Sequence, residues 1–291
     1  MASANDYWRA EYPTADAIAA KTKKVKDVDK LAKALTEDLK EPVDKYRAIF
    51  TWIALNITYD CKAFKTQDFS NIEPAKVLAK GKSVCEGYSA LFEAMCKAVG
   101  LECSTIAGWT KNSLGKIGSE FAPNPTHAWN AIQLNKKWYL IDVTWAAGAT
   151  EGNCDKFIKE FTPVYFCTPP DVFMMNHYPQ DEKWLLGAKV SKKEFQQAPH
   201  FFRKALEHNV KNLKPANGIL QYKKGMTLDF QFSIDKPVKS ITVKPIEETY
   251  GTEMKYKQSG NKVSFAYTLP RKTKYLLVFF DLQGAIVYKV E

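Results

Sequence analysis

The stretch KGKSVCEGYSALFEAMCKAVG, residues 80–100, places Cys85 where a polar, glycine-marked turn gives way to a helical pattern. With Ser83 as N-cap and Glu86 three residues later, we expect Cys85 in the first helical turn, where unpaired N–H groups and the helix dipole favour an anion such as a thiolate. Gly100 ends the pattern. Apolar residues recur at the period of a helix with one buried face, at Tyr88, Leu91, Phe92, Met95 and Val99.

We expect helices before this stretch and strands after it. Residues 15–57 carry a helical period that breaks at Pro42, and EPAKVLAKGK predicts a short helix that Gly81 ends. A long loop at 110–126, rich in Gly, Pro, Ser and Asn, is of the kind that is usually functional or disordered. The fold class is α+β, with helices followed by an antiparallel sheet. Strands are predicted by the β-branched and aromatic residues of LECSTIAGW, THAWNAIQLN and KKWYLIDVTW.

The sequence pattern changes near residue 213. Residues 151–212 are irregular and aromatic, and we expect them to wrap the core. Residues 213–291 alternate short apolar segments with turns such as Ser259-Gly260-Asn261, which predicts an immunoglobulin-like β-sandwich. We therefore expect two domains, at 1–212 and 213–291. The second contains no Cys or His, so it carries no nucleophile–base pair.

Composition excludes several classes of protein. The chain is 45% hydrophobic and 13% aromatic, as expected for a globular fold. Its formal charge of +10 comes from 42 basic residues that are scattered rather than grouped. Nearly all are lysine, and only four arginines are present, so we expect no nucleic-acid binding.

No apolar run approaches the roughly 18 residues that span a bilayer, so no membrane span is predicted. The first residues lack the basic and apolar regions of a secretory signal. On the sequence as given the protein is expected in the cytoplasm, or in a secreted or periplasmic location if a signal peptide has been removed.

Six cysteines are spread along the chain without a C-x-x-C pair or a Cys/His cluster, so no structural zinc site is expected. They are too sparse for a disulfide scaffold. Most are expected to be small buried hydrophobes, which is the usual state of free cysteine. The six are Cys61, Cys85, Cys96, Cys103, Cys154 and Cys167.

A hairpin places a histidine beside an aspartate. If the second and third predicted strands turn at residues 135–136, Leu134 pairs with Lys137, and His127 and Asp142 lie diagonally on one face. A carboxylate on one imidazole nitrogen fixes the tautomer and leaves the other nitrogen to accept a thiol proton. This arrangement favours a role for Cys85 as a nucleophile over a role as a buried core residue.

These residues resemble a known family. The segments VCEGYSALFEAMCKAVGLEC, HAWNAIQLNKKWYLIDVTW and AIFTWIALNITYD are similar to those of the transglutaminase-like superfamily, and they look most like its kyphoscoliosis peptidase and cytokinesis-protein branch. The resemblance covers roughly residues 40–190, including the aromatic tail FTPVYF and HYPQDEKWLL. It implies a papain-like fold, in which a helix carrying the cysteine packs on an antiparallel sheet carrying the histidine and aspartate.

The resemblance assigns Cys85 as nucleophile, His127 as general base and acid, and Asp142 as the group that orients His127. Because a protonated imidazole and a helix N-terminus both lower a thiol pKa, we expect the pKa of Cys85 to be depressed. One oxyanion donor would be the Cys85 N–H and the other the side chain of Tyr59. Three aromatic residues are candidate pocket or core residues, Tyr88, Trp129 and Trp145, and three histidines are expected to be structural, His177, His200 and His208.

Two functions remain open. In the first, the Cys85 thiolate attacks a peptide or glutamine carboxamide carbonyl, and the thioester is resolved by water in a protease or deamidase, or by an amine in a transglutaminase. In the second, the protein is a catalytically silent scaffold that binds protein partners. Neither function needs a metal or a cofactor. The expected substrate is a protein or peptide, and the β domain could bind a further protein partner.

Overall fold

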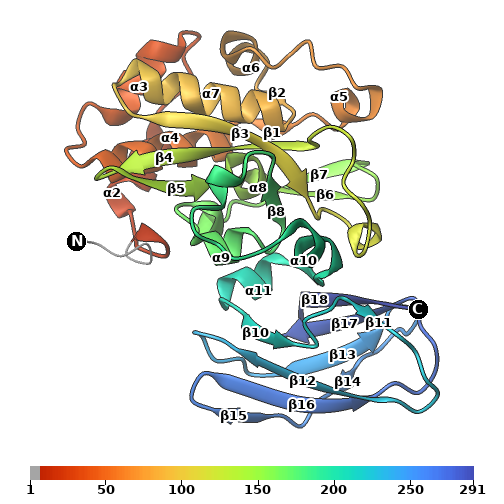
Figure 1. The fold of residues 1–291 in the computed structure, drawn as a ribbon. Helices are drawn as coiled ribbons and strands as arrows, with labels where there is room; N and C mark the ends of the chain where they lie inside the picture. Colours follow the sequence, from red (N-terminus) through yellow and green to blue (C-terminus); the bar gives the residue numbers. More distant parts are fainter. Residues whose placement is uncertain (1–6) are drawn as a thin grey trace. The chain divides into compact units, whose positions relative to one another are not determined.

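The computed structural model describes residues 7–291 (Figure 1). Residues 1–6, on which the expectation about a signal peptide partly rests, lie outside the described residues. The chain divides into two compact units, each built from several stretches of sequence. The predicted boundary at residue 213 stays a prediction. The first unit comprises the residues up to Gly108, Pro125–Pro170 and Pro179–Leu186, and the second comprises Trp109–Asn124, Asp171–Tyr178 and Gly187–Glu291.

Three helices open the first unit: α2 (Pro13–Lys21), α3 (Val28–Thr36) and α4 (Pro42–Asn56). Pro42 stands in the first turn of α4, where a missing N–H costs nothing, and the helix is buried from Tyr46 to Ala54. This burial includes Arg47, whose guanidinium donates two hydrogen bonds, at 2.7 and 2.9 Å, to the carboxylate of Asp16 in α2. The buried charge is therefore paired, as burial of an ion requires.

Helix α7 (Cys85–Ala98) begins at the cysteine itself. The expectation that Ser83 caps it is wrong, because Val84 is the N-cap and the Ser83 hydroxyl donates to the carbonyl of Asn71 at 2.5 Å. Ser83 lies instead in β2 (Lys82–Ser83), which pairs in parallel with β1 (Thr58–Tyr59). Just before β2, α6 (Pro74–Lys80) ends as predicted at Gly81, whose φ is +69°. A paired strand thus fixes the backbone that leads into α7.

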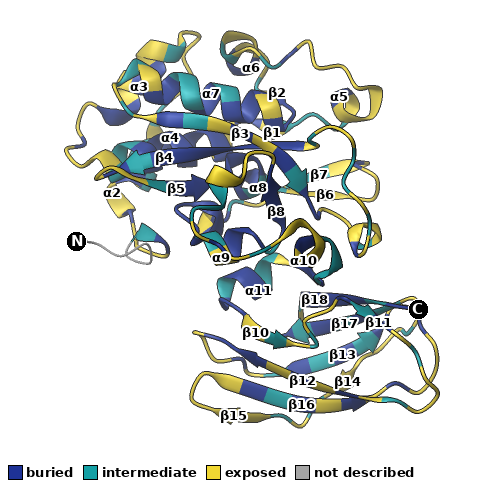
Figure 2. Cartoon of the chain, viewed as in Figure 1, coloured by how far each residue is buried: buried dark blue, intermediate teal, exposed yellow. Residues whose placement is uncertain are grey.

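The sheet of the first unit is antiparallel and lies against α7. Strand β4 (His127–Leu134) pairs with β3 (Cys103–Thr110) on one side and β5 (Lys137–Ile141) on the other, and α7 packs on β4 (Figure 1). The predicted register is confirmed, because Leu134 pairs with Lys137. Nearly every residue of β4 is buried, as Figure 2 shows.

The last predicted strand is shorter than expected. β5 ends at Ile141, and Asp142 is the N-cap of α8 (Val143–Ala147), accepting a hydrogen bond from the Trp145 N–H at 2.9 Å. An aspartate satisfies the orphan N–H groups of a helix start, and here that outweighs the β-propensity of Val143 and Thr144. The carboxylate therefore sits at a junction between a strand and a helix.

A disulfide joins two peripheral elements of the first unit. It links Cys61, the first residue of α5 (Cys61–Thr66), to Cys154 in the turn between β6 (Gly148–Glu151) and β7 (Lys156–Lys159). These two cysteines, whose separation of 93 residues gives no local motif, are the exceptions to the expected pattern. The expectation that most of the cysteines are small buried hydrophobes is confirmed, because four are free and buried, namely Cys85, Cys96, Cys103 and Cys167.

Short elements make up most of the chain between residues 110 and 207. The predicted irregularity is confirmed there, and the loop at 110–126 holds a single helical turn, η1. None of the helices in residues 7–291 combines the length and the apolar character that crossing a membrane requires. The short elements are η1 (Leu114–Lys116), η2 (Pro163–Tyr165), α9 (Pro170–Phe173), β8 (His177–Pro179), η3 (Glu182–Leu185), α10 (Lys192–Gln197), β9 (His200–Phe201) and α11 (Arg203–Glu207).

Two sheets form the carboxyl-terminal part of the second unit. One has the strand order β10-β12-β16-β15, and the other β11-β18-β17-β13-β14 with β9 also paired to β18. Their strands are β10 (Lys211–Lys214), β11 (Ile219–Leu220), β12 (Thr227–Ser233), β13 (Ile241–Pro245), β14 (Thr252–Glu253), β15 (Lys257–Ser259), β16 (Lys262–Thr268), β17 (Tyr275–Phe280) and β18 (Gln283–Val290).

The two sheets share one core. Burial alternates along β12, so one of its faces is apolar and covered. From that strand the ring of Phe230 lies 5.6 Å from that of Tyr288 in β18, and Phe232 lies 5.3 Å from Phe280 in β17. The immunoglobulin-like topology stays a prediction. The first sheet begins with β10, which contains residue 213.

We predict that Gly87→Ala destabilises the first unit although alanine is the better helix former. A Cβ on Gly87 would stand 2.7 Å from Ser83 Cβ and 2.9 Å from Val77 Cγ2. Overpacking of this kind costs roughly 1–3 kcal/mol, which exceeds the gain of about 1 kcal/mol in helix propensity. Chemical denaturation would measure the loss. Gly115→Ala, where a Cβ meets open space, is the control, and equal stability of the two variants would contradict the tight packing at Gly87.

Candidate active site

Cys85 is held at the first position of α7 and is 5% exposed. Two elements fix its backbone, the helix that follows it and the strand β2 that precedes it. The first N–H groups of a helix have no partner within the helix, and their partial positive charge lies at this cysteine. The first-turn position predicted from the sequence is therefore confirmed.

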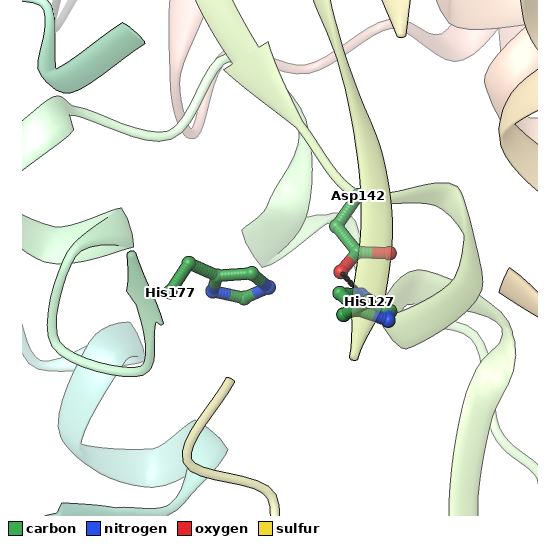
Figure 3. A group of neighbouring side chains, drawn as sticks. All are labelled: His127, Asp142 and His177. Carbon is green, nitrogen blue, oxygen red and sulfur yellow. Dashed lines mark hydrogen bonds and ion pairs between the residues drawn. The ribbon is translucent and has the colours of Figure 1, made fainter. Parts of the chain in front are cut away.

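His127 and Asp142 face each other across the start of β4 and the end of β5 (Figure 3). His127 Nε2 lies 2.7 Å from Asp142 Oδ2, and the two side chains are 6% and 0% exposed. The other carboxylate oxygen, Oδ1, accepts the Trp145 N–H at 2.9 Å. With both oxygens engaged, the carboxylate holds the imidazole through Nε2 and directs Nδ1 elsewhere. The predicted proximity of the two residues is confirmed.

The thiol of Cys85 completes the constellation, because it lies close enough to His127 for each group to shift the pKa of the other. Burial lowers the pKa of His127, but the negative charges of Asp142 and Cys85 outweigh that effect and raise it to about 10. The imidazole is therefore stabilised as a cation by the two groups that flank it. The three residues expected from the sequence lie together.

The expected depression of the Cys85 pKa is wrong. Burial raises the pKa of this thiol, and His127 lowers it by less than burial raises it. A second contribution comes from Glu86, whose Oε2 accepts a hydrogen bond from Cys85 Sγ at 3.1 Å and whose charge also raises the thiol pKa. The sequence pattern had placed Glu86 in the first helical turn, three residues after the expected N-cap Ser83. Burial and Glu86 thus favour the protonated form of Cys85 in this conformation.

Tyr59, the oxyanion candidate, lies beside the thiol. It pairs with Ser83 across the parallel strands β1 and β2, two residues before Cys85. Burial raises the pKa of Tyr59 far above its usual range, and the negative charges of Cys85, Glu86 and Asp142 raise it further. Its hydroxyl therefore remains protonated and able to donate a hydrogen bond. The role in catalysis stays a prediction.

Of the three aromatic pocket candidates, one retains exposed surface. Trp145 is half-buried, and its ring lies 5.7 Å from that of His127. Trp129, 6.0 Å from His127, is completely buried in β4. Tyr88 is also buried and donates its hydroxyl to the Ile57 carbonyl at 2.7 Å. Trp145 thus stays a candidate pocket residue, whereas Trp129 and Tyr88 belong to the buried core.

The remaining histidines lie in the second unit and have structural contacts there. His177 stacks on Phe173 with ring centroids 4.0 Å apart. Burial lowers the pKa of His200 to about 4, which leaves this ring neutral near pH 7. His208 Nδ1 donates to the Lys236 carbonyl at 2.9 Å. These contacts agree with the structural roles expected for the three residues.

Residues 29–143, which contain Cys85, His127 and Asp142, match the model of the transglutaminase-like superfamily. Kyphoscoliosis peptidase from Mus musculus is 32% identical over 182 residues, which are 62% of this chain and 28% of that protein. The Homo sapiens protein is 32% identical over 187 residues, with 64% and 28% covered. The chain thus spans little more than a quarter of these relatives. A solved structure described as a TGase is 21% identical with a TM-score of 0.31, over 45% of this chain and 31% of that one.

We predict that Glu86→Gln lowers the pKa of the Cys85 thiol, because it removes a negative charge and a carboxylate acceptor that both favour the protonated form. Alkylation of Cys85 by iodoacetamide, followed across pH and located by mass spectrometry, should become faster at pH 7. Glu102→Gln removes an exposed charge that is not among the groups shifting this pKa, so it serves as the control. Identical pH profiles for wild type and Glu86→Gln would refute the assigned role.

Proposed function

We propose that this chain is a cysteine-dependent acyl-transfer enzyme that uses Cys85, His127 and Asp142 as a triad, a proposal supported by the match of residues 29–143 to the transglutaminase-like superfamily. The observation that carries the proposal is the buried His127–Asp142 hydrogen bond of 2.7 Å beside a thiol at a helix N-terminus. Structural histidines seldom have a fully buried carboxylate on one nitrogen and a thiol on the ring as well. The substrate is a protein or peptide.

The reaction begins with Cys85 as a thiolate beside the protonated His127, the Cys85 proton having left the site. The thiolate attacks the carbonyl carbon of a peptide or glutamine side-chain amide, and the tetrahedral intermediate collapses as His127 gives its proton to the leaving amine or ammonia. The thioester is then attacked by water, which yields an acid, or by an amine, which yields a new amide. In either case His127 accepts a proton from the attacking group, and departure of the sulfur regenerates the thiolate beside the protonated His127.

Asp142 contributes by holding His127 in one tautomer. With Nε2–H donated to the carboxylate, Nδ1 is the nitrogen that gives and accepts the proton in these steps. The negative oxygen of the intermediate would be stabilised by the Cys85 backbone N–H and by the hydroxyl of Tyr59, whose raised pKa supports a donor role. The half-buried Trp145 would flank the acyl group at the entrance.

A specific observation favours the alternative of a catalytically silent scaffold. The thiol is 5% exposed, and its pKa is raised by burial, so the resting conformation presents little thiolate. In that case the triad geometry would be retained without turnover, and the chain would bind protein partners. We assign the partner-binding role in either case to an immunoglobulin-like β-sandwich at residues 213–291, which contain no Cys or His.

Incubation with a mixture of glutamine-containing peptides, with and without a primary amine, separates these possibilities. Hydrolysis of a side-chain amide, amine incorporation and backbone cleavage each give a distinct mass change. The enzyme proposal expects at least one of these products from the wild-type chain and none from Cys85→Ala. Absence of all products and of any covalent Cys85 adduct with an electrophilic peptide would leave the scaffold function.

We predict that Asp142→Asn lowers kcat by roughly two to four orders of magnitude, because an amide can hold His127 in the wrong tautomer. The comparison variant is Asp29→Asn, which removes an exposed carboxylate from the first turn of α3. Steady-state kinetics on the best peptide product, with circular dichroism to verify folding, would measure the effect. Unchanged turnover in a folded Asp142→Asn protein would remove Asp142 from the triad.

A further inference from the structure

The Cys61–Cys154 disulfide ties together two elements that bury few of their own residues. In α5 only Ala63 is buried, and no residue of strands β6 and β7 is buried. Beside the bridge, the Lys65 ammonium pairs with the Asp155 carboxylate, but both side chains are well exposed. Exposed ion pairs contribute between zero and about 1 kcal/mol. The covalent bond is therefore the principal link between α5 and the β6–β7 turn.

The turn that carries Cys154 is held in an unfavourable backbone conformation. Cys154 has a φ of +56°, in the left-handed region that side chains other than glycine seldom adopt. Gly152, two residues earlier, also has a positive φ, of +59°, and its conformation is the one glycine tolerates. An open bridge would leave this turn without its covalent constraint at Cys154.

The two bridged elements hold the aromatic neighbour of the nucleophile. The ring of Tyr59 lies 6.2 Å from Phe64 in α5 and 6.2 Å from Phe157 in β7. Tyr59 in turn pairs across β1 and β2 with Ser83, two residues before Cys85, and the Cys85 thiol is 5% exposed. A change in the separation of α5 from the hairpin is therefore transmitted to the side chain beside the thiol.

We propose that Cys61 and Cys154 form a redox modification site, and that their disulfide keeps Tyr59 in place over the Cys85 thiol. Reduction releases α5 and the β6–β7 hairpin, and the thiol becomes accessible. This inference concerns the reactivity of Cys85 alone and does not depend on the proposed catalytic function.

The reductant required is a dithiol. Its thiolate attacks Cys61, which is partly exposed, whereas Cys154 is 6% exposed. Cys154 leaves as a thiolate and takes up a proton, and a mixed disulfide remains on Cys61. The second thiol of the reductant then displaces Cys61, which also becomes a thiol. Two electrons and two protons pass to the protein, and the reductant leaves as a cyclic disulfide.

The test uses the full chain and pulses of iodoacetamide at a fixed pH, before and after treatment with dithiothreitol that is then removed. Peptide mapping by mass spectrometry first establishes whether the untreated protein contains the Cys61–Cys154 cross-link. Alkylation rates are then measured for Cys85, Cys96 and Cys167, since the last two are completely buried and report global unfolding. The double variant Cys61→Ser/Cys154→Ser mimics the reduced state, and Lys65→Ala removes the neighbouring ion pair while keeping the bridge.

We expect the alkylation rate of Cys85 to rise about tenfold on reduction and in the double variant, because local opening around the thiol becomes easier. The alkylation rates of Cys96 and Cys167 should not change. Lys65→Ala should behave as wild type in both redox states. The proposal is overturned if no cross-linked peptide is found, or if the alkylation rate of Cys85 is the same with the bridge intact and reduced. It is also overturned if the alkylation rates of all three cysteines rise together. The dithiothreitol arm remains informative even if the double variant does not fold.

Discussion

A completely buried carboxylate needs partners for both of its oxygens, and Asp142 finds them on two elements. Oδ1 accepts the N–H of Trp145 at the start of α8, and Oδ2 accepts from His127 at the start of β4. The same side chain thus begins a helix and orients an imidazole. Because the strand must stop at Ile141 for this to happen, the local fold and the chemistry of the site depend on one residue.

The charges around the thiol act in opposite directions. His127, held as a cation by Asp142, favours the thiolate, whereas burial and Glu86 favour the thiol. Burial is the largest of these effects, so the described conformation is a protected one. In the proposed reaction, substrate binding would supply either a change in solvation or a new partner for Glu86 before sulfur acts as a nucleophile.

The structural features that depend on residues close together in the chain could be predicted from the sequence. The α7 period, the two-residue turn that sets the pairing of Leu134 with Lys137, and hence the approach of His127 to Asp142, all follow from residues near one another in the chain. The predictions that were wrong depend on three-dimensional context. The Ser83 hydroxyl donates to the carbonyl of Asn71 instead of capping α7, and the sign of the Cys85 pKa shift depends on burial. The Cys61–Cys154 bridge joins residues that share no motif.

That bridge also has a topological consequence. Cys85, His127 and Asp142 all lie in the sequence between the two bridged cysteines, and so does the irregular loop at 110–126. A single proteolytic cut in this loop would separate the nucleophile from its base along the backbone, but the two fragments would stay covalently joined through sulfur. The site belongs to a closed ring of polypeptide, and one cut in that ring yields two separate fragments only if the disulfide is also reduced.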